Sequence, residues 1–153
     1  MKLSPLQMTR CVVTNIGCAA NQQFDPEKEI QGALEHFFIN AKASPVEPEI
    51  GVKEHSWSVE LEIIQKKAEG TNYPYDFNIS IFGFFTCKDG ILPTEKETQF
   101  VQVNGCSMLY GMAREHIRSL TATGPWGAII LPTMSFYEQK EQPKKEDSAA
   151  KAP

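Results

Sequence analysis

The sequence predicts an α+β fold, in which strands fill the first part of the chain and a helix fills the second. Apolar and polar residues alternate over residues 57–63, as they do in a strand with one wet face. In the second part, Leu109, Ala113 and Ile117 recur at the spacing of one helix face instead. Strands followed by a helix are typical of the α+β class.

Length and charge narrow the class of protein further. The chain has 153 residues, which suits one domain. Its net charge of −4 and pI of about 5.4 argue against a nucleic-acid partner, which needs a clustered basic surface. No apolar run approaches the roughly 20 residues that span a bilayer, and residues 1–13 lack the apolar core of a secretory signal. We expect a cytoplasmic protein that is not inserted into a membrane.

Four strands are predicted in order. Residues 9–20 are rich in β-branched and small residues and form the first. In residues 24–34, Asp25 followed by Pro26 is typical of a helix start, so a short helical or irregular piece is expected there. A strand is then expected at about 35–43, although Phe38 also continues a helical spacing.

The third and fourth strands cover 57–63 and 75–86, and a polar connection joins them. The fourth strand carries apolar residues on one face throughout. Phe82 and Phe84 make its other face apolar as well. We expect these two side chains to meet an overlying helix or a second subunit, with an exposed groove for a partner as the alternative.

The second part of the chain is predicted to hold two helices and an arm. Thr94 and Glu97 fit a capping box for a short helix reaching about Phe100. A second helix is expected to start at Asn104 or Ser107 and to end at Gly124, where a positive φ is favourable. The apolar run 126–131 then forms an arm. Residues 138–153 are charged and Pro-rich, so we expect a disordered tail.

The residues give no positive sign of an enzyme. Four cysteines occur without a CxxC pair, which disfavours zinc and fits free thiols in a reducing compartment. Cys11 and Cys18 are an odd number of residues apart, so on one regular strand they would face opposite sides. Cys106 and His116 lie too far apart along a helix to form a catalytic pair. No phosphate loop, dinucleotide motif or nucleophile elbow is present.

The segment from Met108 to Phe136 resembles the C-terminal half of the SecB family of protein-export chaperones. The resemblance rests on an apolar and aromatic run ending in Ala113-Arg114-Glu115, a helix, Gly124, and an apolar arm ending in Leu131-Pro132 and Phe136. The order and rough length of the four strands extend a weaker resemblance to most of residues 1–137, which we expect to form one SecB-like chaperone domain.

This resemblance implies a four-stranded antiparallel sheet packed against a long C-terminal helix. It also implies a homotetramer, built as a dimer of dimers, that acts as an ATP-independent holdase without a cofactor. Its partners would be unfolded or precursor polypeptides, together with the export motor SecA or, in some relatives, an antitoxin.

Candidate residues follow from the apolar surface that such a chaperone needs, since apolar and aromatic contacts bind many sequences without strict specificity. The expected polypeptide-binding residues are Phe37, Phe38, Ile39, Phe82, Phe84, Trp126, Ile129 and Leu131. The expected oligomer-interface residues, all on the main helix, are Leu109, Tyr110, Arg114 and Ile117. A dedicated antitoxin chaperone, and a small-molecule enzyme or binding protein on an α+β scaffold, remain alternatives.

Overall fold

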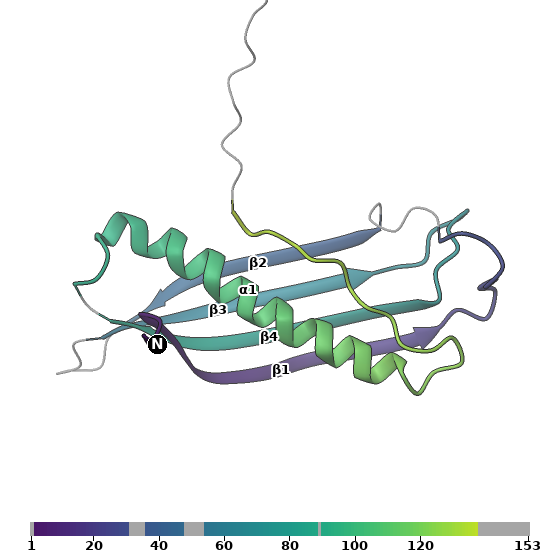
Figure 1. Cartoon of the computed structure of the whole chain (residues 1–153), viewed down its shortest axis with the longest axis horizontal. Helices are drawn as coiled ribbons and strands as arrows, with labels where there is room; N and C mark the ends of the chain where they lie inside the picture. Colours follow the sequence, from purple (N-terminus) through teal and green to yellow (C-terminus); the bar gives the residue numbers. More distant parts are fainter. Residues whose placement is uncertain (1, 31–35, 48–53, 89, 138–153) are drawn as a thin grey trace, which may run out of the picture.

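A computed structural model of the chain describes residues 2–30, 36–47, 54–88 and 90–137. It contains one antiparallel sheet of four strands in the order β1-β4-β3-β2. The strands are β1 (Leu6–Ala20), β2 (Phe37–Val46), β3 (His55–Gln65) and β4 (Tyr75–Cys87). A single helix crosses one face of the sheet (Figure 1). The predicted α+β fold is confirmed, whereas the predicted tail at 138–153 lies outside the described residues.

Strand β1 is irregular, which overturns the sequence prediction for its faces. The pairing with β4 shifts between Met8 and Arg10 and again between Val13 and Asn15, as at a β-bulge. Each extra residue reverses the alternation of side chains. Cys11 pairs with Gly83 and Cys18 with Phe77, so both cysteines lie on the helix-covered face and pack against the core. Both remain free thiols.

The other strands follow the predicted alternation. The helix-covered face of β4 is buried throughout, and that of β3 is buried from Trp57 onward. These faces supply Val59, Leu61 and Ile63 together with Phe77, Ile79 and Ile81. The opposite face of the sheet, which we call the outer face, holds half-buried residues such as Ser58 and Ser80. Burial of the first set against the helix is the main apolar contribution to the fold.

Helix α1 (Thr94–Thr121) is continuous, whereas two helices were predicted. Asn104 and Ser107, the predicted caps, lie inside it and donate hydrogen bonds to the backbone oxygens of Phe100 and Val103. The helix continues through Gly105 because it lies directly on the sheet there. A Cβ at this position would come within 2.9 Å of Val59 Cγ2. Close packing thus explains a glycine that local propensity alone disfavours.

The predicted capping box at the start of α1 is also wrong. The backbone oxygen of Pro93 accepts hydrogen bonds from the backbone nitrogens of Lys96 and Glu97. The buried Glu97 side chain turns to the sheet, where it accepts hydrogen bonds from Trp57 Nε1 at 2.8 Å and from His55 Nδ1 at 2.9 Å. The Glu97 carboxylate is therefore bound by the sheet and is not available to cap the helix.

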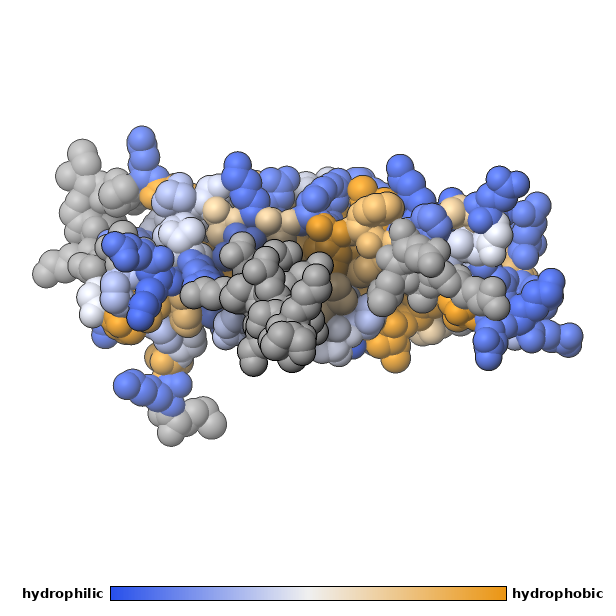
Figure 2. Space-filling model, turned by 90° about the horizontal axis from the view of Figure 1, so that it is seen from above, coloured by the Kyte–Doolittle hydropathy of each residue, from blue (hydrophilic) through white to orange (hydrophobic). Residues whose placement is uncertain are grey.

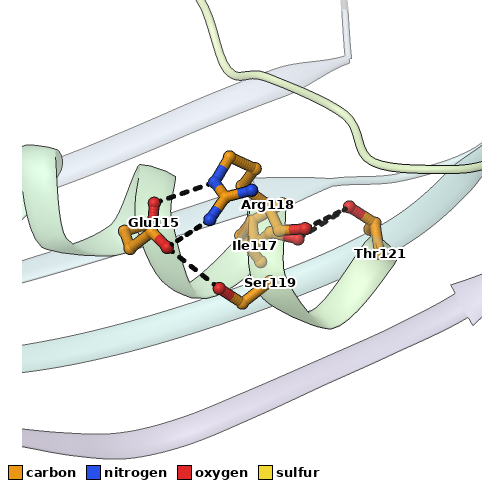
Figure 3. A network of polar contacts seen from close by, with 5 residues as sticks. All are labelled: Glu115, Ile117, Arg118, Ser119 and Thr121. Atoms are coloured by element: carbon orange, nitrogen blue, oxygen red, sulfur yellow. Dashed lines mark hydrogen bonds and ion pairs between the residues drawn. The ribbon is translucent and has the colours of Figure 1, made fainter. Parts of the chain in front are cut away.

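The end of α1 depends on space at one glycine and on positive φ at another. The helix ends at Thr121, three residues before Gly124. A Cβ on Gly124 would lie 2.5 Å from the Tyr75 hydroxyl, while the positive φ of 74° belongs to Gly127. Gly124 thus allows the Tyr75 side chain to pack closely against the backbone. It does not form the left-handed turn that was predicted. Near this end, Glu115 pairs with Arg118 and Ser119, and Thr121 donates to the oxygen of Ile117 (Figure 3).

Between β1 and β2, the described part of residues 24–34 is a turn and not a helix. Asp25 Oδ1 accepts a hydrogen bond from the backbone nitrogen of Glu27, and Asp25 pairs with Lys28 at 3.2 Å. Residues 31–35 of this predicted piece lie outside the described residues.

Helix α1 is not apolar enough to cross a bilayer.

Candidate functional site

An apolar groove lies between the sheet and the arm, here defined as residues 126–137. It runs beside the start of β2 on the helix-covered face and has a volume of about 550 Å³. Figure 2, which views the molecule from the β2 side, shows hydrophobic residues gathered around a hollow. The groove is lined by Ile30, Phe37, Gln65, Tyr73, Pro74, Phe77, Ala128, Ile129, Ile130, Leu131 and Pro132.

The arm forms one wall of the groove, and side chains of α1 hold it in place. Arg114 Nε donates a hydrogen bond to the backbone oxygen of Leu131 at 3.0 Å. The Tyr110 hydroxyl donates to the oxygen of Pro132 at 2.6 Å, and the Tyr110 ring packs edge-on against Phe136. An extended segment bound only by its own side chains would have many conformations. These bonds fix its backbone and so predefine the wall.

The other end of the arm is anchored near the tip of the sheet. Thr121 Oγ1 accepts a hydrogen bond from the backbone nitrogen of Ile129, and the Tyr75 hydroxyl accepts one from that of Trp126. The Trp126 indole donates to the oxygen of Asn21 and packs edge-on against Phe24, with ring centroids 5.4 Å apart. Both ends of the wall are therefore tied to the body of the molecule.

The groove offers apolar surface together with two polar side chains whose hydrogen-bonding capacity is not fully used. None of its lining residues carries a charge. The Tyr73 hydroxyl is buried without a hydrogen-bond partner among the described residues, and burial raises the pKa of this group. Gln65 is buried in the floor, with one long contact from Nε2 to the oxygen of Lys66 at 3.4 Å. Such a site suits an apolar occupant that also brings hydrogen-bonding groups.

The edge of β2 adds main-chain groups to the site. Lys66 donates its backbone N–H to the oxygen of His36, so these two residues form a hydrogen-bonded pair. In an antiparallel ladder such pairs alternate along the strand, and the register continues from Phe37 with Gln65. The N–H and C=O groups of Phe37 and Ile39 therefore point away from β3, along an edge that no other described strand covers.

The eight predicted polypeptide-binding residues lie in different parts of the structure, and only some of them line the groove. Phe37, Ile129 and Leu131 line the groove, and Ile39 lies on the same face of β2, packed against the core. Phe38, Phe82 and Phe84 lie on the outer face, opposite the helix. Trp126 anchors the arm instead of lining the groove.

The structure also shows which of the predicted apolar residues are covered and which are exposed. Helix α1 lies on the opposite side of the sheet from Phe82 and Phe84, so it does not cover them (Figure 1). Their rings lie 6.1 Å apart, and Phe84 is exposed. Within the arm, Leu131 faces the core, Ile129 is half-buried, and Ile130 is 72% exposed. The arm thus serves both the core and the open surface.

The predicted interface residues lie largely inside the chain. Leu109 and Ile117 are completely buried against the sheet, and Tyr110 is nearly so. Arg114 is half-buried and bound to the arm. The core and the arm account for the burial of all four, so the apolar stripe of α1 is explained without a second subunit. Assembly into a tetramer stays a prediction.

Several groove residues were missed by the sequence analysis. Tyr73 and Pro74 fell in a segment assigned as a polar connection, and Phe77 was assigned to the buried face of its strand without reference to a groove. Ile130 belonged to the predicted arm but was not among the predicted binding residues. Its position between Ile129 and Leu131, on the other side of an extended segment, was the signal that could have identified it. Nothing in the sequence singled out Gln65.

Comparisons with known proteins bear on the fold. No family model and no curated protein matches the sequence. Among solved structures, the fold is similar to that of the Mycobacterium tuberculosis Rv1957 SecB-like chaperone in complex with a ChAD peptide from the Rv1956 HigA1 antitoxin. That match has a TM-score of 0.51 and 16% identity, and it covers 85% of this chain and 91% of that chain.

A second solved structure, a protein of unknown function from Streptococcus agalactiae, matches with a TM-score of 0.56 and 11% identity. It covers 84% of this chain and 97% of the other. Similarity at these identities shows the fold alone. The chain therefore has a SecB-like fold, as predicted.

Proposed function

We propose, from the SecB-like fold of this chain, that the protein is an ATP-independent chaperone that holds non-native polypeptides in the cytoplasm. The groove between the arm and the sheet is the observation that carries the proposal. It presents apolar surface without charged lining residues, next to the outward main-chain groups of Phe37 and Ile39. An unfolded polypeptide complements this site, because it exposes apolar side chains that can fill the groove and main-chain groups that can pair with the edge of β2.

The chemistry of the groove favours a polypeptide over a small charged metabolite. A charged ligand would need an opposite charge or several hydrogen-bond donors to compensate for its lost hydration. The described lining has no charged residue, and only two of its side chains, Tyr73 and Gln65, carry a hydrogen-bond donor. Apolar contacts from Ile129, Ile130 and Phe37 instead tolerate many side chains, which is the behaviour that a holdase needs.

Suppression of aggregation tests this proposal. Chemically denatured citrate synthase is diluted into buffer without nucleotide, with and without an excess of the protein, and light scattering is followed. We expect the wild-type protein to slow aggregation. Ile130→Glu places a charge at an exposed position of the groove wall and should remove most of the effect. Ile16→Glu makes the same change at another exposed apolar position, on the opposite sheet edge, and is the control.

Failure of the wild-type protein to slow aggregation at any excess would rule out the holdase proposal. Equal loss in both variants would instead point to general destabilisation, which their unfolding curves would reveal.

A dedicated antitoxin chaperone is the second candidate. It is favoured by one observation, the antitoxin peptide bound to the Rv1957 SecB-like chaperone of similar fold. The export proposal expects binding of many precursor polypeptides and of SecA. The antitoxin proposal expects tight binding of one antitoxin encoded beside this chain. Titration of the purified protein with SecA and with such an antitoxin distinguishes the two. Light-scattering mass tests the proposed homotetramer.

A further inference from the structure

Gln102 of α1 occupies part of the open edge of β2. Its Nε2 donates a hydrogen bond to the backbone oxygen of Ala41 at 3.1 Å, and its Oε1 accepts one from the backbone nitrogen of Ala43 at 2.7 Å. A residue of a parallel neighbouring strand would make this same pair of bonds, one to residue i and one to residue i+2. The side-chain amide thus takes the place of a strand at this point.

The two halves of the β2 edge consequently differ. Ala41 and Ala43 have the same outward orientation as Phe37 and Ile39, because all four alternate with the residues bonded to β3. Gln102 satisfies the groups of the alanine pair. No hydrogen bond within the described residues reaches the outward groups of Phe37 and Ile39. The half of the edge at Phe37 and Ile39, whose outward groups are not hydrogen-bonded by the described residues, is the half beside the groove.

We propose that Gln102 limits the length over which a bound polypeptide pairs with β2. An extended client would add to the edge at Phe37 and Ile39, with alternate side chains entering the groove, and its pairing would end at Gln102. Gln102 is then a specificity-determining residue that sets a short footprint. This inference rests on the proposed chaperone function and concerns the same site.

The chain's own C-terminal segment is a poor occupant of this site. Residues 138–153 are dominated by charged and polar residues, and their apolar side chains are alanines and prolines. They offer nothing to fill a groove formed by Phe37, Phe77 and Ile129. A foreign polypeptide with larger apolar side chains fits the site better.

The length dependence of peptide binding tests the inference. The probes are fluorescein-labelled peptides of alternating leucine and threonine, from 4 to 12 residues, and affinity is measured by anisotropy with the full-length protein. For the wild type, affinity should rise with length and then level off. Gln102→Leu frees one main-chain group of Ala41 and one of Ala43. The plateau should therefore move to peptides about two residues longer, and the longer peptides should bind about 30-fold tighter, as for two added hydrogen bonds.

Two further variants control this experiment. Gln99→Leu makes the same change at an exposed position one turn earlier and should leave the plateau unchanged. Gln102→Ala removes both the donor to the Ala41 oxygen and the acceptor for the Ala43 nitrogen. It should shift the plateau in the same direction, and it serves if the leucine variant does not fold.

The possible outcomes separate this inference from the proposed function. An identical plateau in the wild type and in both folded Gln102 variants overturns the role of Gln102, while peptide binding itself still supports the chaperone proposal. Absence of binding for every peptide, together with unchecked client aggregation, overturns both.

Discussion

Arg114 on α1 and Leu131 in the arm are joined by a hydrogen bond from the guanidinium Nε to the backbone oxygen, at 3.0 Å. Leu131 is itself buried in the core, so the bond lies where the arm passes from the core to the groove. One face of α1 thus packs on the sheet, and a neighbouring face holds the wall of the candidate site. Stability and binding are linked through this helix.

Arg114→Met should weaken client binding more than it weakens the fold. The substitution keeps the apolar stem but removes the donor to Leu131, at a cost of about 1 kcal/mol in unfolding free energy. With the wall less fixed, we expect peptide affinity to fall by roughly fivefold. Urea unfolding and anisotropy measure the two quantities. Arg118→Met, on the exposed face of the same helix, should leave affinity unchanged, and an equal loss in both variants would contradict the role of the arm.

Gly124 and Gly111 should respond oppositely to the same substitution. An alanine at 124 would bring its Cβ to 2.5 Å from the Tyr75 hydroxyl, which bonds both Thr121 and Trp126. Displacing Tyr75 should lower the unfolding free energy by about 1–3 kcal/mol. Gly111 lies in the middle of α1 with open space around it, so Gly111→Ala should raise it by about 0.5–1 kcal/mol. Thermal unfolding of the two variants checks the signs.

The pair formed by Glu115 and Arg118 predicts a pH dependence. Hydrogen bonds from Arg118 and then Ser119 lower the pKa of the Glu115 carboxyl from 4.5 to about 2 (Figure 3). Because the folded pKa is depressed, this stabilisation is present above pH 4.5 and is lost as the pH falls towards 2. Glu115→Gln should therefore reduce the unfolding free energy at pH 6 but have little effect near pH 2.

Unfolding of both proteins across this pH range is the measurement. Since the pair is exposed to solvent, 1 M salt should shrink the difference at pH 6. A difference between the two proteins that does not change with pH would contradict the assignment of the pKa to this pair.

The cysteines should react in an order set by burial. Cys106 belongs to α1 and is completely buried in the core, and desolvation raises its pKa to about 11. The thiolate is the reactive form, so Cys106 should be alkylated slowly by iodoacetamide at pH 8. Cys11 and Cys18 are half-buried on β1 and should react sooner. Peptide mass spectrometry resolves the sites, and all four should react alike in denaturing urea. Early labelling of Cys106 would contradict its placement.

Much of the fold was predictable because it follows from local patterns. The alternation over residues 57–63 reflects the burial of one face of β3, and the stripe formed by Leu109, Ala113 and Ile117 is the face of α1 on the sheet. These periods depend only on secondary structure. Predictions that depended on local propensity alone failed where tertiary contacts override it. Glu97 binds Trp57 instead of capping its helix, and the helix passes through Gly105.

The candidate site was predictable only in part, because a groove is made by segments far apart in sequence. The apolar residues Phe37, Ile129 and Leu131 were singled out by composition. Their meeting depends on where α1 places the arm. The two register shifts in β1 and the amide of Gln102 on β2 leave no pattern in the sequence, since each depends on the register of one particular pairing.

Site-specific photo-crosslinking tests the central claim most directly, namely that non-native polypeptides bind in the groove between the arm and β2. Benzoylphenylalanine is placed at Ile130 in the groove wall or at Phe84 on the outer face, both of which are exposed. Each protein is irradiated with an unfolded client and with the same client after folding. The account predicts strong crosslinks to the unfolded client from position 130, and little from position 84. Crosslinks mainly from position 84, or equal crosslinks to the folded client, would contradict it.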